Sequence, residues 1–264
     1  MLVEFVSLVA SLNMSQSEIR IVGLHGLPEI GEGDDLTSLI TSRVRDAKIE
    51  IAGGDIFVIA QKVVSKAEGR TVDLATISPS LRAVEWAEAW AKDPRVVEVV
   101  LAQSRSIIRM EQGVIISETE HGFICANAGV DASNTRDSTV VLLPVDPDAS
   151  ARRIQAGLEA AFRVSLAVVI SDTFGRPWRE GLVNVALGVA GIAPIVDYRG
   201  QPDSYGRPLR VTAIAVADEL ASAAELVMGK TGQVPVVLVK GFGYEVRESS
   251  ARELSRDPAR DLFR

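Results

Sequence analysis

The stretch LAVVISDTFGRPWREG, residues 166–181, decides how the rest of the chain is interpreted. It begins with five apolar residues, the pattern of a buried strand. Asp172 and Thr173 follow, and Arg176 and Arg179 come shortly after them. A carboxylate at the carboxyl end of a buried strand lies where open sheets bind ligands. Asp172 is therefore either a turn cap paired with one of the arginines or a metal ligand, and this stretch alone leaves both interpretations open.

The composition is that of a globular protein. The chain has 264 residues, of which 47% are hydrophobic and 24% charged. That is enough for a sizeable core in one large domain or two closely joined ones. The formal net charge of −7 argues against non-specific binding to nucleic acid or anionic membrane surfaces. No apolar run reaches the roughly 20 residues of a membrane span, so we expect no nucleic-acid and no membrane partner.

Cysteine and histidine are scarce. Cys125 is the single cysteine, which excludes an internal disulfide, and His25 and His121 lie far apart in the sequence. A zinc site of cysteine and histidine ligands is therefore not expected. A metal would be held by oxygen ligands, which favours Mg²⁺ or Mn²⁺. The cysteine usage is typical of the reducing cytoplasm.

The first residues look separate from the globular part. Residues 1–18 contain a short apolar run without the basic segment that begins a signal peptide. We interpret them as a loose tail or as a misassigned start, with Met14 as the alternative first residue. The folded domain is expected to cover residues 19–264.

Hydrophobic periodicity predicts both helices and strands. The order of these elements has no clean βαβ period, so we predict an α+β or α/β fold, with two interleaved subdomains. The expected helices are 34–44, 79–105 with a break near Pro94, 146–162 and 217–229. The expected strands are 19–23, 56–60, 106–109, 114–117, 138–144, 166–170 and 234–242.

Three further motifs carry polar side chains. QKVVSKAEGR, residues 61–70, is expected to be a polar turn after a strand, and its cations suit a polyphosphate or a carboxylate. AGVDASN, residues 128–134, places Asp131 among small residues; an Asx turn is the competing interpretation. Tyr205 lies in the loop DSYGRPL and is a weak candidate for stacking. Together the motifs favour metal-assisted phosphoryl chemistry over covalent hydrolysis.

The tripeptide GKT, residues 229–231, is not a phosphate-binding P-loop. That motif lies between a strand and a helix and has Gly at its first position. Here the first position is Ala224, and the preceding segment is predicted to be helical. We expect a helix C-terminus instead.

Seven segments in one order resemble the coenzyme F-420-0:gamma-glutamyl ligase family. The resemblance runs from about Ile19 to the C-terminus, and it is the order that makes it specific. The segments are GLPEIGEGDDL, QKVVSKAEGR, HGFICANAGVDASN, LLPVDPDASA, ISDTFGRPWREG, DYRGQPDSYGRPL and VADELASAAELVMGK.

The resemblance implies a GTP-dependent ligase that joins L-glutamate to F-420-0, followed by a second, gamma-linked glutamate. GTP would phosphorylate the terminal carboxylate, and the glutamate amine would attack the resulting acyl phosphate, releasing phosphate beside GDP. It also implies Mg²⁺ or Mn²⁺, a monovalent cation such as K⁺, a homodimer, and an α+β fold of two intertwined subdomains.

The resemblance also implies roles for individual residues. Asp131, Asp172 and Thr173 match metal ligands, and Asp131, Asp172 and Lys66 are the expected catalytic residues. Arg176, Arg179 and Tyr205 are our candidates for substrate contacts, the two arginines for its anionic groups. The residues that match nucleotide contacts are Pro28, Glu29, Ile30, Gly31, Gln61, Lys62, Lys66, Asn134, Met228, Gly229, Lys230, Thr231 and Gly232.

Lys230 departs from the family pattern. Archaeal members have Glu there, in a position that resembles a metal ligand, and an ammonium group cannot ligate a metal. Lys230 would instead neutralise phosphate charge, or water would replace the carboxylate. The C-terminal segment resembles bacterial members, some of which continue into a flavin-binding domain; because this sequence stops at Arg264, we expect a form that lacks it. Two alternatives stay open: a non-catalytic F-420 or nucleotide carrier, and a generic metal-dependent phosphotransferase.

Overall fold

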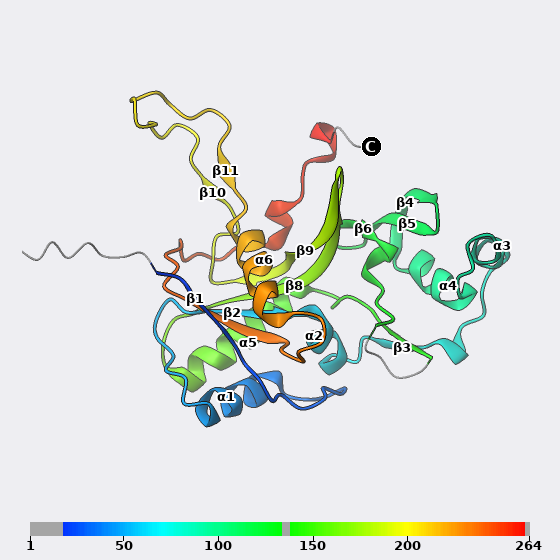
Figure 1. Ribbon diagram of the computed structural model, residues 1–264, viewed down its shortest axis with the longest axis horizontal. Coiled ribbons are helices and arrows are strands. Elements are labelled where there is room, and N and C mark those ends of the chain that lie inside the picture. Colours follow the sequence, from blue (N-terminus) through cyan, green and yellow to red (C-terminus); the bar gives the residue numbers. More distant parts are fainter. Residues whose placement is uncertain (1–17, 134–137, 262–264) are drawn as a thin grey trace, which may run out of the picture.

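A five-stranded mixed sheet forms the centre of the molecule (Figure 1). The computed structural model describes residues 18–133 and 138–261. The strand order is β1-β12-β2-β8-β9, and only β2 and β8 run parallel. The strands are β1 (Arg20–Gly23), β2 (Ile56–Ala60), β8 (Ala167–Arg176), β9 (Arg179–Ala190) and β12 (Val236–Lys240). Helices and a mixed sheet together confirm the predicted α+β class.

Helices cover both faces of this sheet. Along β2 the side chains alternate, because successive residues of a strand point to opposite faces. Phe57 and Ile59 pack in the core shared with α1 and α5, whereas Ile56 and Val58 pack in the core shared with α6. The helices are α1 (Leu36–Asp46), α2 (Gln61–Ala67), α5 (Pro147–Phe162) and α6 (Val216–Met228).

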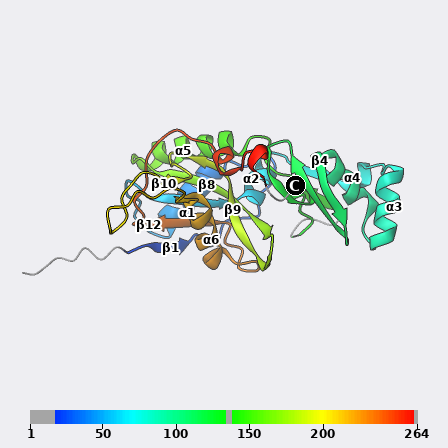
Figure 2. The same cartoon turned by 90° about the horizontal axis from the view of Figure 1, so that it is seen from above.

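Residues 71–143 form a second group of elements, the outer lobe, at one end of the molecule in Figures 1 and 2. The predicted helix break near Pro94 is confirmed, since Asp93 caps a new helix there. The lobe contains β3 (Thr71–Asp73), α3 (Leu81–Trp90), α4 (Pro94–Ala102), β4 (Ser104–Glu111), β5 (Val114–Thr119), β6 (Ile124–Ala126) and β7 (Thr139–Val141).

An apolar cluster joins the outer lobe to the sheet. Phe123 and Leu143 of the lobe segment pack with Leu187 of β9, and Phe174 and Val185 border them. The cluster therefore fixes the β8–β9 hairpin against the lobe. Burying each of these large side chains contributes about 1.5–3 kcal/mol.

A long arm extends from the opposite end of the molecule (Figures 1 and 2). It comprises residues 198–212, between the short strands β10 (Val196–Asp197) and β11 (Ala213–Ile214). Short 3-10 helices complete the described chain at 74–76, 127–129, 251–254 and 258–260. Within the described ranges, no helix is both long and apolar enough to cross a membrane.

Two local predictions were wrong. Residues 61–67 form a helix rather than a polar turn, and no side chain caps its start at Ala60. Strand β8 does not end at Ile170 as predicted. It continues to Arg176 and forms a hairpin with β9. Asp172 therefore lies inside a strand, paired with Val185, at the point where burial decreases along β8.

Candidate functional site

The parallel pairing of β2 and β8 brings two predicted motifs together. Ala60 is in register with Ser171, so helix α2 begins beside the residue that precedes Asp172. Parallel strands end at the same edge of a sheet, which is why segments more than 100 residues apart in the chain meet here. The predicted ligand edge thus lies at the end of β2, while β8 continues past it into the hairpin with β9.

Helix α2 presents two lysines on one face. Lys62 and Lys66 are four residues apart, the spacing that places side chains on the same side of a helix. Gln61 is buried and accepts a hydrogen bond from Ser65 Oγ at 2.8 Å. Of the nucleotide candidates in this motif, the two lysines project from the helix and pair with acidic residues, whereas Gln61 forms a hydrogen bond within the helix.

Lys62 reaches from the sheet to the outer lobe. Its Nζ lies 2.6 Å from Asp131 Oδ2 and donates to Ser133 O at 2.8 Å. Asp131 is itself fixed by backbone hydrogen bonds to Val141 in both directions. The ion pair therefore joins a helix of the sheet unit to a loop of the lobe.

Asp131 combines both of its sequence interpretations. The backbone N–H of Ser133 donates to Asp131 Oδ1 at 2.6 Å, which is an Asx turn, while the other carboxylate oxygen pairs with Lys62. Burial raises the pKa of this carboxyl, but hydrogen bonds from Lys62 and Ser133 outweigh it, so the pKa lies below its ordinary value. Asp131 is therefore an anion at neutral pH.

Asp172 is the carboxyl group of the site whose pKa is raised. Burial raises the pKa of its carboxyl to about 6; the negative charge of Asp131 adds to this, and Lys62 and Lys230 oppose it. None of the ion pairs among residues 18–133 and 138–261 includes Asp172. A half-buried carboxylate of this kind gains stability from a bound cation.

A second set of contacts, the Lys230 network, lies beside Asp172. Thr173 Oγ1 donates to Asn184 Oδ1 at 2.7 Å, and Asn184 Nδ2 donates to Glu225 Oε2 at 3.0 Å. Lys230 Nζ lies 2.7 Å from Glu225 Oε1 and donates to Thr173 Oγ1 at 2.6 Å. Sequence reasoning named Thr173 and Lys230 but missed Asn184 and Glu225.

The structure places the remaining nucleotide candidates in two ways. Glu29 Oε1 pairs with Lys66 Nζ at 2.6 Å, so the loop at residues 28–31 folds over α2. Ile30 and Met228 are buried in the two sheet cores and act in packing. Pro28, Gly31, Gly229, Thr231 and Gly232 are exposed beside these segments, and Asn134 lies outside the described residues.

The substrate candidates are not brought to the carboxylates within this chain. Arg176 and Arg179 face each other at the end of the β8–β9 hairpin. Arg176 lies four positions along the strand from Asp172, which is roughly 13 Å of chain. Tyr205 belongs to the arm, which points away from the outer lobe in Figures 1 and 2.

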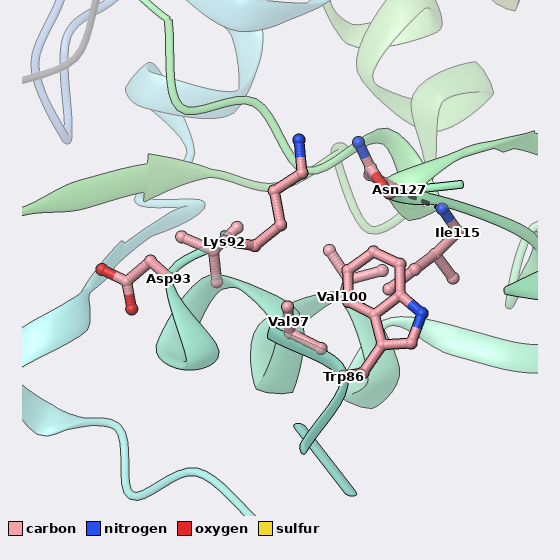
Figure 3. A pocket seen from close by; sticks show the side chains of 9 residues that line it. Trp86, Lys92, Asp93, Val97, Val100, Ile115 and Asn127 are labelled. Atoms are coloured by element: carbon pink, nitrogen blue, oxygen red, sulfur yellow. Dashed lines mark hydrogen bonds between the residues drawn. The ribbon is translucent and has the colours of Figure 1, made fainter. Parts of the chain in front are cut away.

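A cavity in the outer lobe lies apart from these residues (Figure 3). Trp86, Val97 and Val100 form its apolar wall, and Lys92 and Asn127 lie at its edge. Its volume is about 140 Å³. That is well below the roughly 300–1,000 Å³ typical of pockets for drug-sized ligands, so we do not assign it a substrate.

The donor set fits an oxygen-bound cation better than zinc. In the described ranges no three His, Cys, Asp or Glu side chains gather as a metal cluster. The carboxylates of Asp131 and Asp172 act on each other electrostatically, and Thr173 adds a hydroxyl. Two carboxylates and a hydroxyl suit Mg²⁺ or Mn²⁺ with further ligands from water or phosphate. Fold and site together define an α+β protein whose candidate site combines acidic oxygen ligands with lysines.

Comparison with known proteins identifies the family. A family model described as F420-0:Gamma-glutamyl ligase matches residues 26–241. A protein of Methanothermobacter thermautotrophicus named Coenzyme F420:L-glutamate ligase is 48% identical over 249 residues, covering 93% of this chain and 99% of the relative. Proteins of the same name from Methanopyrus kandleri and Methanocaldococcus jannaschii are 45% and 41% identical, over 89% and 94% of this chain and 94% and 97% of their own lengths. The chain belongs to the F420-0:Gamma-glutamyl ligase family.

Proposed function

We propose that the protein is a GTP-dependent amide ligase that joins L-glutamate to coenzyme F-420-0 and then adds a second glutamate through a gamma link. Family membership supports the ligase activity, since close relatives bear the name Coenzyme F420:L-glutamate ligase over nearly the whole chain. The observation that carries the proposal is the meeting of Asp131, Lys62 and Asp172 at one edge of the sheet.

In the proposed reaction, the terminal carboxylate of F-420-0 attacks the γ-phosphorus of GTP. A carboxyl O–P bond forms, the bond to the bridging oxygen breaks, and GDP leaves. The amine of glutamate then attacks the activated carbonyl carbon. A C–N bond forms, the carbon–oxygen bond to phosphate breaks, and the amine proton passes to solvent.

The main obstacle to this reaction is the repulsion between the substrate carboxylate and the negatively charged triphosphate. The lysines would bind the triphosphate and offset this repulsion with their positive charges. Lys62 and Lys66 project from one face of α2, and Lys230 is held near Asp172 by its hydrogen bond to Thr173. Ammonium groups fixed beside developing negative charge stabilise a transition state without reorganising. Lys66 and Lys62 are our candidates for the phosphate contacts, with Glu29 and Asp131 as their partners in this structure.

A divalent ion would be held by Asp131 and Asp172, whereas the Thr173 hydroxyl, the third predicted ligand, contacts Asn184 and Lys230 in this structure. When bound, the ion would neutralise negative charge between the substrate carboxylate and the nucleotide phosphates. The raised pKa of Asp172 supports this assignment, because a cation would relieve the cost of burying that carboxylate beside Asp131.

The direct test is to incubate the protein with GTP, Mg²⁺ or Mn²⁺, K⁺, L-glutamate and F-420-0 and to follow the product by mass spectrometry. We expect one and then two added glutamyl residues, with GDP and phosphate released. GTP hydrolysis without amide formation would indicate a phosphotransferase instead. Tight F-420-0 binding without GTP consumption would indicate a carrier.

We also propose that the protein acts as a cytoplasmic homodimer. Support comes from exposed apolar side chains on both projecting segments: Trp178 and Leu182 on the hairpin, and Tyr205 and Val211 on the arm. Burying them against a second copy would remove apolar surface from water. Light scattering should give twice the chain mass for the protein, and Trp178→Ser should weaken association while Leu81→Ser, in the outer lobe, does not.

A further inference from the structure

The Lys230 network contains a buried amide whose chemistry sets the direction of every hydrogen bond in it. Asn184 is buried, and its side chain donates through Nδ2 and accepts through Oδ1. Since Nδ2 donates to Glu225, Oδ1 faces Thr173, and the Thr173 hydroxyl must donate to it. The lone pairs of Thr173 Oγ1 are then directed to other groups.

Lys230 occupies one of those lone pairs. Its ammonium contacts Thr173 Oγ1 at 2.6 Å and Glu225 Oε1 at 2.7 Å. Both partners are oxygens, one neutral and one anionic, as around a bound metal cation. The ammonium also acts electrostatically on Asp172, the next residue along the strand from Thr173. It therefore sits where a cation is stabilised by the protein.

Of the charged side chains at and around Asp172, some have an ion-pair partner of opposite charge among the described residues, and one does not. Lys62 matches Asp131, and Lys230 matches Glu225. Asp172 is the acidic group of this neighbourhood that no described ion pair matches. A divalent ion at Asp172 completes the balance, whereas a second one beside Thr173 would meet the ammonium of Lys230 at close range.

We propose that the ammonium of Lys230 is a permanent cation of the site, that Asn184 and Glu225 position it against Thr173, and that the protein takes one divalent ion rather than two. This inference rests on the proposed function, because it assigns the second positive charge of the same nucleotide site to a side chain. Asn184 and Glu225 act as positioning residues through Lys230 and need not touch the nucleotide.

The first experiment counts bound Mn²⁺ by electron paramagnetic resonance of the free ion, using the full chain at pH 8 without nucleotide. We expect one site in the unaltered protein and two in Lys230→Glu, which places a carboxylate beside Glu225 and Thr173. Glu219→Gln, an exposed change on the same helix, is the matched control and should keep one site. Circular dichroism melting verifies that each variant is folded.

The outcomes separate this inference from the proposed function. Two sites in the unaltered protein, or one in folded Lys230→Glu, would overturn the inference while leaving ligase activity standing. No Mn²⁺ site in the unaltered protein would overturn the metal-dependent function and this inference together. If Lys230→Glu does not fold, Lys230→Gln combined with Asn184→Asp places the added carboxylate elsewhere in the network, and the same count decides.

The second experiment tests whether Glu225 acts through Lys230. We expect Glu225→Gln and Lys230→Met each to raise KM for GTP about tenfold, a size typical of groups that orient a ligand-contacting residue. In the double variant the effects should not multiply, because Glu225 has no ammonium left to position. A full multiplicative loss would mean that Glu225 is a structural residue only and would refute its positioning role.

Discussion

Two lysine–carboxylate pairs lie near Asp172, and they are built in opposite ways. Lys62–Asp131 joins helix α2 of the sheet unit to a loop of the outer lobe, and Asp131 is further fixed by Ser133. Lys230–Glu225 lies within the sheet unit, between the end of helix α6 and the turn that follows it. The first pair depends on how two parts of the molecule dock, and the second depends on one helix end.

From this difference we expect the first pair to depend on how the two parts dock and the second to supply a fixed charge. Both lysines lower the pKa of Asp172, so the carboxylate between them responds to each. Replacing Asp172 should therefore remove the carboxylate on which both lysines act.

The largest effect is expected for Asp172→Asn. The amide keeps the shape of the side chain but removes the charge that would hold a divalent ion, so kcat should fall by about a thousandfold or more. Steady-state glutamate addition measures this, and an unchanged melting temperature shows that the fold is retained. Turnover within tenfold of the unaltered protein would remove Asp172 from the site.

The pair that spans the two parts is tested by Lys62→Met. It removes a phosphate contact and also the link to Asp131, so kcat/KM for GTP should fall by about a hundredfold. This loss should exceed that of Lys230→Met, which touches one part only. Lys62→Arg keeps the charge and serves as the control; an equal loss in Lys62→Met and Lys230→Met would erase the proposed distinction between the pairs.

The titration of Asp172 gives a smaller effect. Its carboxyl has a pKa of about 6, and a proton must leave before a cation binds, whereas the pKa of Asp131 is lowered. Mn²⁺ affinity should thus be constant above pH 7 and weaken about tenfold per pH unit below 6, with a slope of one proton. Isothermal titration from pH 5 to 8 measures this, and a slope of two would mean that Asp131 titrates as well.

The smallest effect is expected at the end of the hairpin. Arg179→Ala should raise KM for F-420-0 by no more than about tenfold, the value of one charge-assisted hydrogen bond, and should leave Mn²⁺ affinity unchanged. Separate titrations of F-420-0 and Mn²⁺ distinguish the two. A change in Mn²⁺ affinity would show that the hairpin end and the carboxylates act as one site.

The sequence pointed to both residues of the first pair, each by itself, but to only one residue of the second. Lys62 and Asp131 lie in polar segments among small or charged residues, where an acid or a lysine stands out. Glu225 lies on an amphipathic helix, where a carboxylate looks like ordinary surface charge. Asn184 carries the one usable signal: it is an amide inside the apolar run LVNVALGVA, and a buried amide requires partners.

The fold shows the same limit. Strands with apolar runs and helices with capping residues were found, including the helix that begins after Asp93. Helix α2 was missed because it starts directly at the end of β2 without a side-chain cap, so its polar sequence looked like a turn. The extension of β8 past Ile170 was missed because its partner β9 stabilises residues whose own sequence is turn-like.

The way the outer lobe is inserted bears on how the protein acquires activity. The chain leaves the sheet unit after helix α2 and returns before α5, so Lys62 and Asp131 are 69 positions apart in the sequence, with most of the outer lobe between them. Contacts between such distant positions form late, because the loop entropy must be overcome first. During refolding from denaturant, the far-ultraviolet circular dichroism signal should therefore recover before cation binding does. The delay between the two recoveries would measure how long the lobe takes to dock on the sheet unit.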